Sequence, residues 1–126
     1  MNYDRSALVG QWFSSSLNSN GDQSTEFSDI QPDGSFEFTF SHYDHNNNLI
    51  EQVIELGDWG LVGDVHFTMT KSEFINEQHY ASDLCDPENY HAYKVLELNS
   101  TTFKYQHVIT QEVFILKRVI DKIGHC

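Results

Sequence analysis

Histidine and carboxylate side chains are numerous enough to raise the possibility of a metal site. The chain has 7 histidines, and imidazole and carboxylate groups are common ligands of divalent metals. Candidate ligands occur around one predicted turn and around one long predicted loop: His42, Asp44, His45, Glu77, His79, Asp83, Cys85, Asp86 and His91. None of them has the His-Glu-x-x-His or Cys-x-x-Cys spacing that is typical of such sites. We therefore expect exposed turn histidines, with no metal and no cofactor.

The sequence contains no motif that is typical of nucleophilic catalysis or of cofactor binding. Cys85 lies between Asp83 and Asp86, whose negative charges disfavour the thiolate that a nucleophile needs. The glycines of the segment 57–63 are not followed by a predicted helix, so they do not form a phosphate-binding or dinucleotide-binding loop. We expect the segment 57–64 to form a bent corner between two strands. The sequence contains no Gly-x-Ser-x-Gly elbow. We predict no catalytic residue.

Composition and charge limit the classes of partner. The chain has 126 residues, 19 acidic against 7 basic side chains, and a formal net charge of -12, so we expect one domain over residues 1–126. Scattered acidic charge opposes binding to nucleic acid or to anionic membranes. Carboxylates such as Glu26 and Asp29 are too numerous to indicate a site. The N-terminal residues lack the pattern of a signal peptide, which predicts a cytoplasmic location, and the oligomeric state stays open.

Alternation of apolar and polar residues with period two predicts an all-β fold. The segment 35–43 shows the pattern, with Phe36, Phe38 and Phe40 on one face. Asp86-Pro87 predicts one helical turn in the segment 86–89. The expected strands cover 10–16, 24–31, 35–43, 49–56, 65–74, 92–98, 102–109 and 113–120. Short connections between about eight strands predict an antiparallel up-and-down β-barrel, which we favour over a sandwich.

The first and last predicted strands carry residues of a known family. A short turn leads into Leu8-Val9-Gly10-Gln11-Trp12, and the last strand ends in Phe114-Ile115-Leu116-Lys117-Arg118. This pattern resembles the lipocalin-like (calycin) barrels, and the stretch 57–64 is similar to small bacterial lipocalin-like proteins of unassigned function. The resemblance implies that Gly10, Trp12 and Arg118 close one end of the barrel. It also implies that a small apolar ligand binds inside. Trp12 with Arg118 could instead anchor a ligand anion.

Period-two faces predict which side chains point inward. The expected set combines aromatic rings with a few polar groups, and we assign as ligand-binding residues Phe38, Phe40, Phe67, Met69, Tyr105 and His107. A packed core would show the same alternation, but buried Tyr105 and His107 need polar partners, which is typical of binding pockets. The segment 76–90 is expected to cover the open end of the barrel as a lid.

Three functions remain open at this stage. The first is non-enzymatic binding of a small, largely apolar molecule inside the barrel, since barrels of this size can hold one ligand. The second is a protein-interaction or inhibitor module that uses loops on a filled barrel. The third is an isomerase or hydratase that works through Tyr105 and His107. The volume of the interior cavity distinguishes the first from the second, because a volume below the roughly 300 Å³ typical of ligand pockets favours the second.

Overall fold

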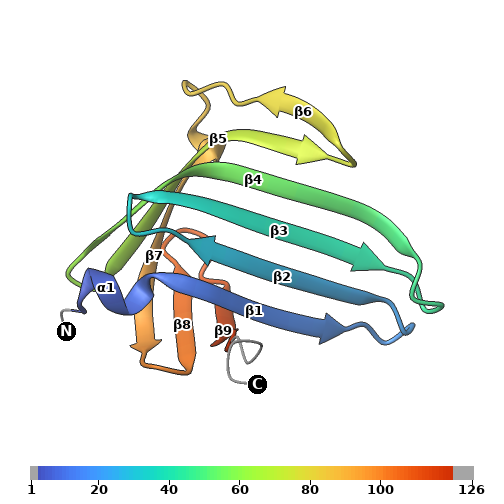
Figure 1. The fold of residues 1–126 in the computed structure, drawn as a ribbon, viewed down its shortest axis with the longest axis horizontal. Helices are drawn as coiled ribbons and strands as arrows, with labels where there is room; N and C mark the ends of the chain where they lie inside the picture. The colour runs from blue at the N-terminus through green and yellow to red at the C-terminus, as the bar shows by residue number, and fades with distance from the viewer. Residues whose placement is uncertain (1–2, 121–126) are drawn as a thin grey trace, which may run out of the picture.

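The computed structural model describes residues 3–120, and most of them belong to β-strands that form a barrel (Figure 1). A one-turn helix, α1 (Arg5–Leu8), precedes the first strand, and a 3₁₀ helix covers Pro87–Asn89. The strands are β1 (Gly10–Leu17), β2 (Gln23–Ile30), β3 (Ser35–Tyr43), β4 (Leu49–Val62), β5 (Val65–Ile75), β6 (Gln78–Ala81), β7 (Tyr90–Leu98), β8 (Thr102–His107) and β9 (Val113–Arg118).

Eight of these strands form a closed ring. The order is β1-β2-β3-β4-β5-β7-β8-β9, and β9 pairs again with β1 through Trp12 and Arg118. Every described pairing is antiparallel. The predicted closed, eight-stranded, up-and-down barrel is confirmed. Because consecutive strands run in opposite directions, the turns alternate between the end that holds α1 and the opposite, open end.

Local sequence explains the tight connections. The turn between β2 and β3 contains Asp33 and Gly34, and Gly34 adopts a positive φ of 95°. At the open end, Asp44 Oδ1 accepts hydrogen bonds from the backbone N–H groups of Asn46 and Asn48. Such side chain to backbone bonds are typical of aspartate and asparagine in turns. The predicted helical turn at 86–89 is also confirmed, since Asp86 caps it by accepting from Glu88 N–H.

One strand is longer than the sequence predicted. The segment 57–64 was expected to be a corner, but β4 continues through it to Val62, with a bulge between Leu56 and Gly57. A Cβ at position 57 would collide with the carbonyl oxygen of Met69 on the neighbouring strand. Gly57 therefore permits close approach of two backbones inside a continuous strand rather than a corner.

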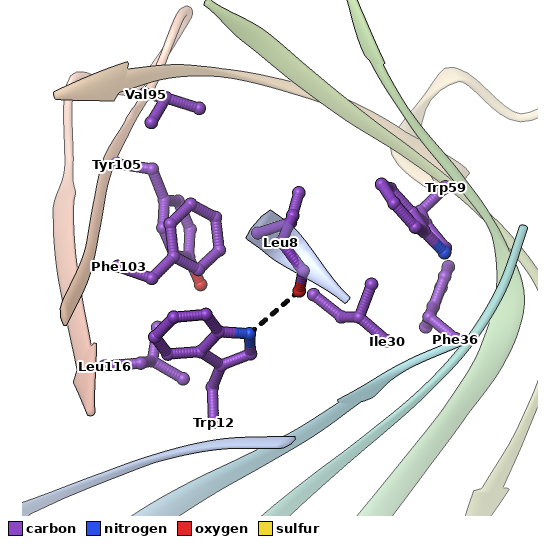
Figure 2. Packing of buried hydrophobic residues seen from close by; sticks show 9 residues of the cluster. All are labelled: Leu8, Trp12, Ile30, Phe36, Trp59, Val95, Phe103, Tyr105 and Leu116. Atoms are coloured by element: carbon purple, nitrogen blue, oxygen red, sulfur yellow. Dashed lines mark hydrogen bonds between the residues drawn. The ribbon is translucent and has the colours of Figure 1, made fainter. Parts of the chain in front are cut away.

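The hydrophobic core lies at the end closed by α1 (Figure 2). Its members are Leu8, Trp12, Ile30, Phe36, Trp59, Val95, Phe103, Tyr105 and Leu116. Trp12 Nε1 donates to the carbonyl oxygen of Leu8 at 3.0 Å, which satisfies the buried indole and fixes α1 across the barrel end. The core therefore fills one end of the barrel and leaves the other end to polar and aromatic side chains.

Arg118 seals the closed end. Its guanidinium carbon lies 4.2 Å from the centre of the Trp12 ring, and its nitrogens donate to the carbonyl oxygens of Ala7, Val9 and Ser100. Gly10 has φ of 135°, and a Cβ there would meet the Arg118 guanidinium. All three donor nitrogens of Arg118 thus donate to backbone carbonyl oxygens at this end of the barrel.

A second arginine–tryptophan pair strengthens the same end. The Arg5 guanidinium lies 4.4 Å from the centre of the Trp59 ring, and it donates to the carbonyl oxygen of Pro32. Trp59 Nε1 donates to the carbonyl oxygen of Gln31 at 2.8 Å. This pair links α1 to the turn between β2 and β3, and sequence analysis did not anticipate it.

The segment expected to be a lid has a different structure. β5 extends beyond Met69, where its pairing with β7 ends, and the free edge of Ser72–Ile75 pairs with the exposed strand β6. Figure 1 shows β6 continuing the sheet beside β5. The lid expectation is wrong, because this segment pairs with a strand edge instead of crossing the opening.

No helix in the described part of the chain has the length and apolar character needed to cross a membrane.

Candidate functional site

The middle of the barrel contains a cavity of about 160 Å³. Its walls come from inward positions of seven strands: Glu26, Phe38, Phe40, Glu55, His66, Thr68, His91, Tyr93, Tyr105 and Phe114. Half of these side chains carry aromatic hydrocarbon or phenol rings, and the other half carry carboxyl, imidazole or hydroxyl groups. A cavity with rings on its walls and a few polar groups is typical of ligand sites.

The cavity opens toward a wider pocket of about 470 Å³ at the open end of the barrel. The two share Glu26, Phe40 and Phe114, so they adjoin each other. The mouth adds mainly small and polar residues: Ser14, Ser15, Ser16, Ser24, Thr25, Ser41, His42, Glu51, Val53, Glu112, Val113 and Ile115. A molecule could therefore enter from solvent through a polar mouth and reach the aromatic interior.

Glu26 is a carboxyl group inside the barrel wall. Tyr105 Oη donates to its Oε2 at 3.1 Å, and Ser28 Oγ contacts the same oxygen at 3.4 Å. Burial raises the pKa of Glu26, the hydrogen bonds from Tyr105 and Ser28 oppose that rise, and the charges of Glu55 and Glu112 add to it. The dominant effect is loss of hydration, which penalises an uncompensated charge.

Glu55 is a second partly buried carboxyl group in the same cavity. Thr70 Oγ1 donates to its Oε1 at 3.3 Å. Burial raises the pKa of Glu55, and the negative charge of Glu73 raises it further. Glu55 also acts on Glu26 through its charge, so the two carboxyl groups share one electrostatic environment.

The two tyrosines of the cavity do not ionise near neutral pH. Burial raises the pKa of Tyr105 well above its usual value, and the charge of Glu26 raises it further. Burial likewise raises the pKa of Tyr93, and nearby glutamate charges contribute. Each phenol keeps its proton, which Tyr105 uses to hold Glu26.

His66 is a neutral acceptor on the cavity wall. Its side chain is almost completely buried, at 2% exposure, and burial lowers its pKa to about 4. Nδ1 lies 3.2 Å from the carbonyl oxygen of Gly60. A carbonyl can only accept, so Nδ1 carries the proton and Nε2 of the neutral ring keeps its lone pair.

His91 and His107 form an ordered pair near the mouth. His107 Nδ1 accepts from the backbone N–H groups of Ile109 and Thr110. Its proton is therefore on Nε2, which donates to His91 Nδ1 at 3.1 Å. This leaves the proton of neutral His91 on Nε2. The pair is a fixed chain of hydrogen bonds with one N–H group left on His91.

Comparison with known proteins identifies the architecture. A crystal structure of a lipocalin-like protein from Bacteroides uniformis is similar, with a TM-score of 0.53 and 15% sequence identity. The match covers 90% of this chain and 99% of that one. This chain has a lipocalin-like fold. No model of a known protein family matches it, and comparison with curated proteins also gives no match.

The lipocalin-like barrel brings three of the six predicted ligand-binding residues to the cavity. Phe38, Phe40 and Tyr105 line it. His107 is buried at the end of β8 but does not line the cavity. It lines a separate pocket with Pro87, Tyr90 and other residues near the connecting loops. The third function considered from sequence relies on Tyr105 and His107. These two side chains have different hydrogen-bond partners, since Tyr105 bonds to Glu26 and His107 to His91.

Phe67 and Met69 were predicted to face inward, and this is wrong. The inward residues of β5 are His66, Thr68 and Thr70, which are buried, whereas Phe67 is 44% exposed. Phe67 lies on the outer face against Gly60, where a Cβ would meet its ring. The hydrophobic alternation of β5 thus marks the outer surface, because the inner surface of this lipocalin-like barrel is polar at that level.

Sequence analysis missed most of the polar wall. Glu26 was set aside as one acid among many, and Glu55, His66, Tyr93 and His91 were not proposed as cavity residues. Counting back by twos from Ile30 would have placed Ser28, Glu26 and Ser24 on the inner face of β2. Within residues 3–120, no group of three or more histidine, cysteine or acidic side chains is arranged to hold a metal.

Proposed function

We propose that the chain is a non-enzymatic binding protein that holds a small organic molecule inside its barrel. The observation that carries this proposal is the partly aromatic cavity that adjoins the mouth and shares Glu26, Phe40 and Phe114 with it. Rings of Phe38, Phe40 and Phe114 offer apolar surface to the ligand, and apolar burial supplies about 25 cal/mol per Å². The ligand therefore has an apolar, ring-sized part that packs against these walls.

The volumes of the inner cavity and of the mouth favour a ligand that occupies both. The inner cavity of about 160 Å³ alone is smaller than the roughly 300 Å³ that is usual for ligand pockets, whereas the mouth of about 470 Å³ exceeds it. A ligand that fills the cavity and extends into the mouth uses both. A filled barrel acting as a scaffold for loops would have neither space.

A ligand screen with a blocked mouth tests the proposal. Thermal-shift and native mass-spectrometry screens would include fatty acids, retinoids, haem and small aromatic amines, alcohols and acids. Ser14 lines the mouth, and the neighbouring Phe13 is exposed on the outer face. We expect Ser14→Trp to abolish binding of any hit and Phe13→Trp to leave it unchanged. Hits that survive Ser14→Trp, or a screen without hits, would overturn the proposal.

A further inference from the structure

The charged groups of the cavity are all of one sign. Glu26 and Glu55 line the inner cavity, and Glu51 and Glu112 line the mouth. No lysine or arginine within residues 3–120 lines either space. The imidazoles that line the two spaces are His42, His66 and His91. His66 is neutral because burial lowers its pKa to about 4. His42 Nε2 lies 3.6 Å from a carboxylate oxygen of Asp22.

The described basic side chains are committed elsewhere. Arg5 and Arg118 cover tryptophan rings at the closed end. Lys71 pairs with Asp58 at 2.9 Å, and Lys117 donates to Thr102. Lys94 and Lys104 alternate with the inward residues Tyr93, Val95 and Tyr105, so they lie on the outer face. No described residue of the barrel supplies a cation to the two buried carboxyl groups.

Hydrogen-bond donors in the cavity are already used, whereas acceptors are not. The hydroxyl groups of Tyr105 and Thr70 donate to Glu26 Oε2 and Glu55 Oε1, and Tyr93 is hydrogen-bonded to Thr68. This leaves Oε1 of Glu26, Oε2 of Glu55 and Nε2 of His66 as acceptors on the cavity wall. One N–H group on His91 and one O–H group of the Tyr93–Thr68 pair remain as donors. A ligand that suits this wall brings donors.

The aromatic walls favour the same kind of ligand. Phe38 and Phe40 lie 6.4 Å apart in an edge-to-face arrangement, and Phe114 stacks on Tyr105 at 5.2 Å. The faces of aromatic rings carry partial negative charge and attract cations. Rings and carboxylates together therefore repel an anionic group and attract an ammonium group, which also supplies three donors.

We propose that the ligand is a small organic cation: an ammonium group bound by Glu26 and Glu55 and joined to a ring or chain that packs on Phe38, Phe40 and Phe114. This inference rests on the proposed function and specifies the chemical class of its ligand. The ammonium group compensates the two partly buried carboxyl groups, whose loss of hydration without a nearby cation is unfavourable. Its N–H donors reach the acceptors that the barrel leaves open.

Three probes with one ring and different head groups test the charge. 2-Phenylethylammonium, 2-phenylethanol and 3-phenylpropionate are titrated into the protein by calorimetry at pH 7.5. We expect the ammonium compound to bind at least about tenfold more tightly than the alcohol, since a charged hydrogen bond is roughly twice as strong as a neutral one, and the carboxylate to bind most weakly. Tighter binding of the alcohol or the acid would overturn the cationic assignment and leave the binding function intact.

Amide variants test the residues. We expect Glu26→Gln and Glu55→Gln each to weaken binding of the ammonium compound by about tenfold or more and to change binding of the alcohol little. Glu37→Gln is the matched control, because Glu37 lies on the outer face of β3 and its loss changes the net charge equally. Equal weakening by Glu37→Gln would assign the effect to overall charge and overturn the proposed contacts.

Proton release provides an independent readout. Burial raises the pKa of Glu26 and Glu55. A bound ammonium group lowers it again, so any proton that these carboxyl groups carry is released on binding. Calorimetry in buffers of different ionisation enthalpy should show release of protons on binding of 2-phenylethylammonium, and less release in Glu26→Gln. Proton uptake, or failure of 2-phenylethylammonium to bind, would overturn the inference, whereas the ligand screen above decides the binding function separately.

Discussion

Arg118 shows how one side chain can close a barrel. It donates to three carbonyl oxygens and covers the Trp12 ring. Lysine keeps the charge but has no planar fork of donors and is not equivalent at such a site. We expect Arg118→Lys to lower the free energy of unfolding by about 1–2 kcal/mol, as measured by urea denaturation. Lys117→Arg, on the adjacent outward position, is the control and should have little effect.

His66 makes stability depend on pH in a defined window. Its folded pKa of about 4 lies below the ordinary 6.5, so the unfolded chain binds a proton that the folded chain does not between these values. Stability is therefore fully present above pH 6.5 and falls as the pH is lowered, by about 3 kcal/mol in total from this residue. Asparagine at position 66 can still donate to Gly60 but does not titrate.

We expect His66→Asn to flatten the dependence of stability on pH between 6.5 and 4, although the variant is less stable overall. The measurement is urea denaturation at several pH values. Glu26 and Glu55 act in the opposite direction, because raised carboxyl pKa values lose stability as the pH rises. Both remain in the variant, so the difference between the two curves isolates His66. Parallel curves would contradict the assignment.

At the scale of the element, two glycines of β4 offer a matched comparison. A Cβ at position 57 meets the backbone of Met69, whereas one at position 60 meets only the exposed ring of Phe67. The backbone cannot move without breaking strand pairing, but the ring can rotate away. We expect Gly57→Ala to cost about 2–3 kcal/mol and Gly60→Ala less than about 1 kcal/mol, as measured by thermal or urea denaturation. Equal losses would contradict the close approach.

The positions of most strands were predictable from the sequence, but which residues of a strand face the barrel interior was predicted correctly only for some strands. Alternation located β3 and placed Phe38 and Phe40 correctly. The same rule failed at β5, since it assumes that apolar residues point inward, and there the inner face carries His66, Thr68 and Thr70. Glu26 and Glu55 were missed for the same reason. β6 was also missed, because pairing along the extended edge of β5 depends on where β7 leaves it.

At the scale of the whole molecule, stability should be uneven along the barrel axis. The buried apolar side chains gather at the closed end, and the cavity and mouth occupy the remainder. Local opening is easiest where few apolar contacts hold a strand. We expect amides near Ile30 and Phe36 to exchange with solvent more slowly than amides near Ser24 and His42 on the same strands. Hydrogen-exchange mass spectrometry measures this, and uniform protection would contradict it.

Both ends of the described chain lie at the sealed end of the barrel. Tyr3 N–H donates to the carbonyl oxygen of Gly63, and Val119 N–H donates to that of Gln11. The mouth faces the opposite way. A tether joined to the chain beyond Tyr3 or Val119 would therefore hold the barrel on a sensor surface with its mouth directed to solution. No new attachment point would have to be engineered for detection of small molecules on such a surface.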